Sequence, residues 1–221
     1  MRVLIAGATG KTGLKLAEEL AANSHTPIAL VREGSDTSAL PEGCETRHGD
    51  LTDLPMDIAE GVDAVVFAAG SGSSTGKEMT KKVDEDGAKA LVDAAERAGV
   101  ERFVMLSSIG VDAPEEGPEA MQPYLKAKRA ADDYLRASSL TETIVRPVAL
   151  TDEPGTGHVI AKASVDPKTE ISRDDVAHVL AVCLDQPEAR HTTFELTSGE
   201  MPITEAVQSL TPTPMPSARP V

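Results

Sequence analysis

The chain has 221 residues, a formal charge of −15 and only 2% aromatic residues. So acidic a surface repels phosphate groups, and no cluster of basic residues interrupts it, which argues against nucleic acids and membranes as partners. The length suits one domain, and no apolar run approaches the roughly 20 residues of a membrane span. Met1 and Arg2 lead into a short strand pattern instead of a signal peptide, and Cys44 and Cys183 stand far apart. We therefore expect a cytoplasmic protein with reduced thiols.

Short apolar runs alternate with helical patterns through the first two thirds of the chain. The runs of strand length are Val3–Ala6, Ile28–Val31, Glu45–His48, Ala64–Ala68, Phe103–Leu106 and Thr143–Arg146. The helical patterns are Thr12–Ala22, a weak one at Thr52–Ala59, Lys77–Ala98 and Tyr124–Ser138. Apolar strands separated by helices predict an α/β fold with a doubly wound parallel sheet that is covered on both faces.

The pattern changes after residue 146. The next expected elements are a hairpin across His158–Ile171, a helix over Arg173–Leu184, a strand at Thr193–Leu196 and a helix near Thr204–Leu210. We expect residues 1–146 to form the doubly wound domain and residues 147–210 to form a small substrate-side cap within the same compact domain. Residues 211–221 are rich in proline and short of apolar residues, so we expect a flexible tail.

Three glycines, Gly7, Gly10 and Gly13, follow the first strand directly and open the first helix. In such a turn the first permits the tight bend, the second lets backbone N–H groups approach a pyrophosphate, and the third allows close helix packing. The same loop offers three further candidate contacts, which are Thr9, Lys11 and Thr12. A P-loop would need a glycine where Ile5 stands, and a plain glycine turn without a ligand is the other alternative.

The second strand ends at Val31 and is followed by Arg32 and Glu33. A dinucleotide-binding fold places here the group that meets the adenosine ribose: an acid accepts from the 2′-hydroxyl of NAD, whereas an arginine matches the 2′-phosphate of NADP. Arg32 therefore favours NADP, although NAD remains open through Glu33. An arginine at a strand end is also compatible with a merely solvated side chain.

Polar and small residues follow the next two strands. Asp50 is placed to accept from an adenine amino group or, alternatively, to cap the following turn or helix. Ala69, Gly70 and Ser71 are small enough for a dinucleotide to lie across them, and a tight turn would also account for them.

Ser107 and Ser108 end the fifth strand, and Tyr124 and Lys128 lie four residues apart at the start of the next helix. Residues at this spacing share one helical face, which would begin beside the serines. A phenol becomes a usable acid or base when an ammonium lies nearby, and a serine hydroxyl can orient a carbonyl. These three side chains, Ser108, Tyr124 and Lys128, are the catalytic candidates. Simple helix packing also produces tyrosine–lysine pairs at this spacing.

Several stretches together resemble the atypical short-chain dehydrogenase/reductase group of NAD(P)H-binding proteins, which includes biliverdin reductase B, flavin reductase-like and nitrogen-metabolite-regulator-like proteins. The stretches are GATGKTG, ALVRE, HGDLTD, VVFAAGSG, VDEDGAKALVDAAERAGVERFVMLSSIG, YLKAKRAADDYLRASSLTETIVRP and ISRDDVAHVLAVCL. The resemblance implies a Rossmann fold with NAD(P) bound by the glycine loop. It further implies that the cofactor is contacted by Arg32 at the 2′-phosphate, Asp50 and Leu51 near adenine, Ala69, Gly70 and Ser71 along the dinucleotide, and the turn of Arg146, Pro147 and Val148 beside the nicotinamide. It makes Ser108 the catalytic serine and Ser107 its support.

The leading hypothesis is an NADP-dependent oxidoreductase that passes hydride between the nicotinamide and a carbonyl or flavin-like acceptor. Tyr124 would manage the proton, Lys128 would hold the ribose, and Ser108 would orient a small-molecule substrate. The alternatives are a non-catalytic NADP(H)-binding regulator or assembly factor and an NAD(P)-dependent epimerase. The five histidines show no ligand spacing, so we expect no metal site. The substrate-selecting contacts are expected in 111–122 and 150–165, and the oligomeric state stays open between monomer and homodimer.

Overall fold

The computed structural model describes residues 1–70 and 76–212. Within them, nine strands form one sheet in the order β11-β8-β10-β6-β5-β4-β1-β2-β3. Its parallel strands are β1 (Arg2–Ala6), β2 (Thr26–Val31), β3 (Glu45–His48), β4 (Ala64–Phe67), β5 (Arg102–Leu106), β6 (Thr141–Pro147) and β10 (Thr192–Ser198). The predicted doubly wound α/β fold is therefore confirmed, because the apolar runs assemble into parallel strands that are buried on both faces, while the edge strand β3 is mostly exposed.

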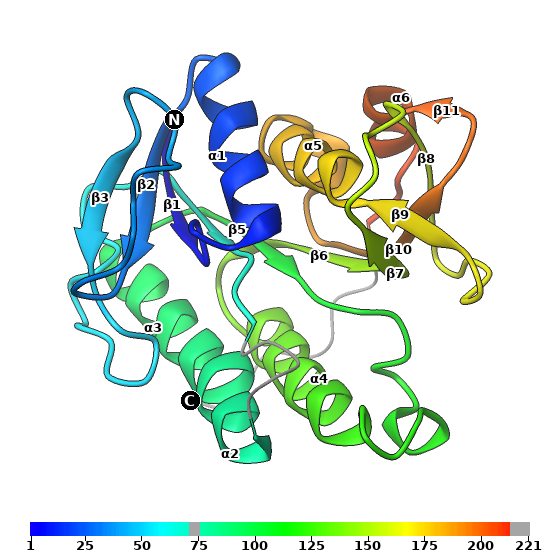
Figure 1. Ribbon diagram of the computed structural model, residues 1–221, viewed down its shortest axis with the longest axis horizontal. Helices are drawn as coiled ribbons and strands as arrows, with labels where there is room; N and C mark the ends of the chain where they lie inside the picture. Colours follow the sequence, from blue (N-terminus) through cyan, green and yellow to red (C-terminus); the bar gives the residue numbers. More distant parts are fainter. Residues whose placement is uncertain (71–75, 213–221) are drawn as a thin grey trace.

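Helices cover both faces of this sheet (Figure 1). On one face lie α1 (Lys11–Ala22) and α5 (Arg173–Asp185), whose buried residues share a core cluster with Val3, Ile5 and Val104. On the other face lie α3 (Ala88–Ala98) and α4 (Gln122–Arg136), which pack with Leu4 and Phe67. Alternate side chains of one strand thus feed two separate cores, as the pleat of a strand requires.

Residues beyond β6 lengthen the same sheet. Strand β8 (His158–Lys162) pairs antiparallel with β10, and β11 (Met201–Pro202) pairs with β8. Two further strands, β7 (Ala149–Thr151) and β9 (Glu170–Ser172), pair with each other, and α6 (Ile203–Gln208) is the last described helix. No helix of the described residues is long and apolar enough to cross a bilayer.

Two sequence expectations about elements were wrong. The weak pattern at Thr52–Ala59 forms turns instead of a helix, because Asp50 holds the Thr52 N–H in a side-chain turn and Pro55 interrupts the segment. The hairpin across His158–Ile171 does not form, since β8 pairs with β10 and β9 pairs with β7. The strand pattern of β8 defined its buried face and carried no information on its partner.

The predicted helix over residues 77–98 contains a π-helical stretch. It runs as α2 (Lys77–Thr80), a π-helix (Lys81–Gly87) and α3. A methyl group at Gly87 would lie 2.8 Å from the carbonyl oxygen of Leu51, so only glycine lets the loop after β3 approach the helix here. The π-helix buries Asp84 completely. Such π-helical turns are frequent at functional sites.

Candidate cofactor and active site

The glycine loop begins directly where β1 ends. Gly7 has a φ of +87°, which favours glycine, and its carbonyl accepts the N–H of Gly10 at 2.9 Å. A methyl group at Gly13 would collide with the Gly7 backbone, so the third glycine permits the helix to start this close to the strand. A methyl group at Gly7 would lie 2.7 Å from the backbone of Ala69. The loop therefore touches the segment after β4, and two predicted cofactor-binding segments meet.

The remaining loop residues differ in their surroundings. Thr9 is exposed and Thr12 is buried at the start of α1. Lys11 is exposed and forms an ion pair with Asp152, which in turn pairs with Arg173 at 2.6 Å. The ammonium of Lys11 thus bridges the glycine loop and the segment after β7.

A small cleft of about 570 Å³ lies at the ends of β2 and β3. It is lined by Arg32, Glu33, Gly34, Ser35, His48, Gly49 and Asp50. One carboxylate oxygen of Asp50 accepts both the N–H and the hydroxyl of Thr52 at 2.8 Å, and these bonds lower the pKa of Asp50 below its usual range. Arg32 is exposed and its charge lowers that pKa further. Asp50 is thus a turn residue that also faces the cleft holding Arg32.

Tyr124 and Ser108 come together at the carboxyl end of β5. Burial has the largest effect on the pKa of Tyr124 and raises it, whereas the charge of Lys128 and a smaller contribution from hydrogen bonding to the Ser108 side chain lower it. Burial outweighs them, together with the carboxylates of Asp84 and Asp132, so the pKa of Tyr124 lies above its usual range. The phenol therefore holds its proton at neutral pH and is in the state of a proton donor.

Lys128 is almost completely buried, with 2% of the residue exposed. Its ammonium donates to the carbonyl of Leu106 at 3.0 Å and to that of Ala69 at 3.3 Å. It also lies 3.5 Å from a carboxylate oxygen of Asp84 and 5.9 Å from the centre of the Tyr124 ring. Lys128 therefore links the end of β5, next to the serines, to the segment after β4. The glycine loop touches that same segment.

The two serines face different partners. Ser107 is buried, and its hydroxyl donates to Asp132 at 3.0 Å. Because Asp132 holds the hydroxyl hydrogen, Ser107 presents only an acceptor to any further neighbour. Ser108 is the serine that meets Tyr124.

The strand end that carries the serines is tied to the carboxyl end of β6. Backbone bonds join the N–H of Ser107 to Val145 at 2.8 Å and the N–H of Ile109 to Pro147 at 3.2 Å. Val148 is buried, and its N–H donates to Leu196 at 3.0 Å.

Gly70 lies beside Asp84, whereas the predicted contact Ser71 falls outside the described residues. Leu51 packs partly buried against the core on the α3 side.

Two buried acidic residues of this site, Asp84 and Asp132, were not identified from the sequence. Asp132 lies four residues after Lys128, which lies four residues after Tyr124, so this spacing places all three on one face of α4. That spacing was a usable signal for Asp132. Asp84 gave no comparable signal, because a regular helical pattern does not reveal the π-helical turn that buries it. Among the described residues, no group of histidine, cysteine and acidic side chains is placed to hold a metal ion.

A family model described as NAD(P)H-binding matches residues 7–187, from the glycine loop to the end of α5. The chain belongs to this NAD(P)H-binding family. The atypical short-chain dehydrogenase/reductase group that the sequence motifs resemble fits this family.

Similar proteins cover nearly the whole chain. The uncharacterised sugar epimerase YhfK of Bacillus subtilis is 41% identical over 215 residues, which are 95% of this chain and 100% of that protein. The structure of a protein assigned provisionally as an NAD-dependent epimerase/dehydratase, from Bacillus halodurans, is also 41% identical, with a TM-score of 0.91 and coverage of 95% and 100%. The oxidoreductase ylbE of Lactococcus lactis is 30% identical, with a TM-score of 0.84 and coverage of 95% and 96%.

Proposed function

We propose that this NAD(P)H-binding protein is an NADP-dependent oxidoreductase that transfers hydride between the nicotinamide and a carbonyl or flavin-like acceptor. The observation that carries the proposal is the position of the buried Lys128 ammonium, which lies 5.9 Å from the centre of the Tyr124 ring and donates to Ala69, in the segment that the glycine loop touches. Ser108 adjoins Tyr124 on the other element of this site. A hydroxyl pair of this kind can bind a carbonyl oxygen and protonate it.

The residues present fit a dinucleotide. The helix N-terminus after the turn at Gly7 would hold the pyrophosphate, and Arg32 in the cleft at the end of β2 would bind a 2′-phosphate. When bound, the cofactor supplies or accepts the hydride. Ser108 orients the acceptor, Tyr124 gives or takes the proton at its phenolic oxygen, and Lys128 lowers the pKa of that phenol.

Turnover by the purified protein tests the proposal. NADPH should be consumed in the presence of at least one member of a panel of quinones, flavins and aldehydes. Tight NADPH binding with no turnover of any member would instead favour a non-catalytic regulator or assembly factor.

The epimerase reading is the second candidate, because proteins 41% identical to this chain carry that designation. An epimerase oxidises and reduces its substrate in turn, so it would retain its cofactor through purification and show no net consumption of NADPH. Release of nucleotide from heat-denatured protein, measured by absorbance, separates this candidate from the leading one.

Arg32→Glu should weaken NADP binding about ten- to a hundredfold while sparing NAD. The substitution turns a charge-assisted contact to the 2′-phosphate into repulsion, and loss of such a contact costs about 1.5–3 kcal/mol. Calorimetric titration with both cofactors measures the effect. The matched control is Arg97→Glu on α3, which makes the same charge change at another exposed position. Equal losses of NAD and NADP affinity in Arg32→Glu would contradict the NADP preference.

A further inference from the structure

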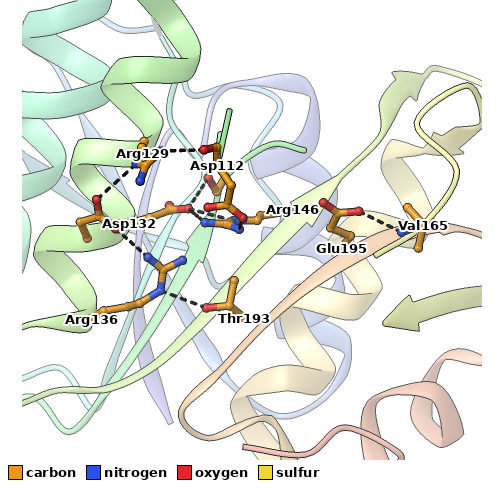
Figure 2. A network of polar contacts seen from close by, with 10 residues as sticks. Asp112, Arg129, Asp132, Arg136, Arg146, Val165, Thr193 and Glu195 are labelled. Atoms are coloured by element: carbon orange, nitrogen blue, oxygen red, sulfur yellow. Dashed lines mark hydrogen bonds and ion pairs between the residues drawn. The ribbon is translucent and has the colours of Figure 1, made fainter. Parts of the chain in front are cut away.

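A series of charged contacts leads to Ser107, the first of the two serines at the end of β5. Arg146, on β6, is 5% exposed and reaches two carboxylates from different segments. Its Nε donates to Asp132 of α4 at 3.0 Å, and its Nη1 donates to Asp112 at 2.7 Å (Figure 2). Asp132 also accepts the hydroxyl of Ser107. Four side chains from four segments, Asp112, Arg146, Asp132 and Ser107, thus form one continuous connection.

Asp112 is the exposed end of this connection and stands at the root of the segment 111–122. This segment joins the serine strand β5 to the tyrosine helix α4. Arg129 of α4 donates to the backbone carbonyl of Asp112 at 2.7 Å, and Gln122 donates to the carbonyl of Gly117 at 3.2 Å. The side chain of Asp112 is 73% exposed in a groove of about 1460 Å³, which Arg146 also lines. Side chains of α4 and β6 thus hold the segment at its root.

A contribution to stability does not by itself explain why Asp132 and Arg146 form a buried ion pair. Among the described residues, one carboxylate oxygen of Asp132 has no hydrogen-bond partner, while its other oxygen lies 2.9 Å from the Nη2 of Arg146 in an ion pair. Buried charges carry a large desolvation cost, and apolar residues of similar volume often stabilise such a position equally well or better. Unlike apolar residues, the guanidinium of Arg146 fixes the orientation of two carboxylates, those of Asp132 and Asp112, at the same time.

We propose that Asp132 and Arg146 are positioning residues that couple the segment 111–122 to the serine pair at the end of β5. This inference rests on the proposed function for its catalytic consequence. Through Arg146, the attachment of the segment at Asp112 and the orientation of Ser107 depend on each other. Ser108 follows directly in the chain, so its alignment with Tyr124 depends on the same connection.

Asp112→Asn tests the coupling without disturbing the core, because the replaced side chain is mostly exposed. Hydrogen exchange of the protein with NADP bound should become about three- to tenfold faster in the segment 111–122, the size of effect expected for a partly exposed charged contact. It should also become faster at Ser107 and Ile109, whose N–H groups bond to β6 and the residue at its end. The matched control is Glu119→Gln, an exposed position in the same segment with the same charge change.

Exchange that increases only in 111–122, or equally in both variants, would overturn the coupling. Arg146→Lys provides a second test, because it keeps the charge and loses the fork. It should lower kcat by about tenfold, as small misplacements of a reacting group do, with the KM for NADPH unchanged. A rise in that KM at constant kcat would contradict the positioning role. If the wild-type protein turns over no acceptor, the proposed oxidoreductase function fails while the exchange measurement still decides the coupling.

Discussion

Tyr124→Phe should lower turnover by about 10²- to 10⁴-fold while cofactor affinity and stability change little. The substitution removes only the hydroxyl, and a positioned proton donor contributes this much to rate. Burial and the nearby carboxylates raise the pKa of Tyr124, so the phenol of the free protein is protonated across neutral pH. Steady-state kinetics with NADPH and an acceptor identified in the panel measure the loss.

Tyr134→Phe is the matched control for this substitution. Tyr134 lies on the same helix, and its hydroxyl donates to Asp93 at 2.6 Å, a contact that lies on the α3 side. The control should therefore keep full turnover. Undiminished hydride transfer in Tyr124→Phe would mean that the proton comes from solvent or from the substrate. The protein would then act mainly by placing cofactor and acceptor, as a flavin reductase-like protein would.

Lys128→Met should lower the free energy of unfolding by about 3–5 kcal/mol, because it removes the ammonium that lies 3.5 Å from the buried carboxylate of Asp84. It also removes the donor to the carbonyls of Ala69 and Leu106. Turnover and cofactor affinity should fall in addition, since the ammonium contacts both the tyrosine ring and the segment after β4 that is proposed to bind the cofactor. Denaturant unfolding and calorimetric titration measure the two effects separately.

The double variant Lys128→Met with Asp84→Asn separates the charge pair from the other contacts of Lys128. Neutralising the buried carboxylate of Asp84 should restore part of the lost stability, and a double-mutant cycle gives the coupling of the two side chains. Stability should recover without turnover, because the ammonium near Tyr124 is still missing. Strictly additive losses would show that Asp84 and Lys128 do not interact.

The sequence by itself determined the architecture and the cofactor class. Runs of buried apolar residues separated by helical patterns admit little besides a covered parallel sheet, and the spacing of Gly7, Gly10 and Gly13 fits a strand-to-helix turn without room for side chains. Because the carboxyl ends of parallel strands meet at one edge, Ser108 and Tyr124 were also expected to be neighbours, and they are.

Only the tertiary structure showed which residues the buried polar groups contact. The pattern of α4 marked Asp132 as one more helical position, and the pattern of β6 gave no partner for Arg146. Their contact depends on the crossing of a helix over a strand, which periodicity does not encode. Periodicity likewise did not predict that a π-helical turn brings Asp84 beside Lys128, or that β8 pairs with β10. Periodicity defines which face of an element is buried, whereas the packing of distant segments defines what that face meets.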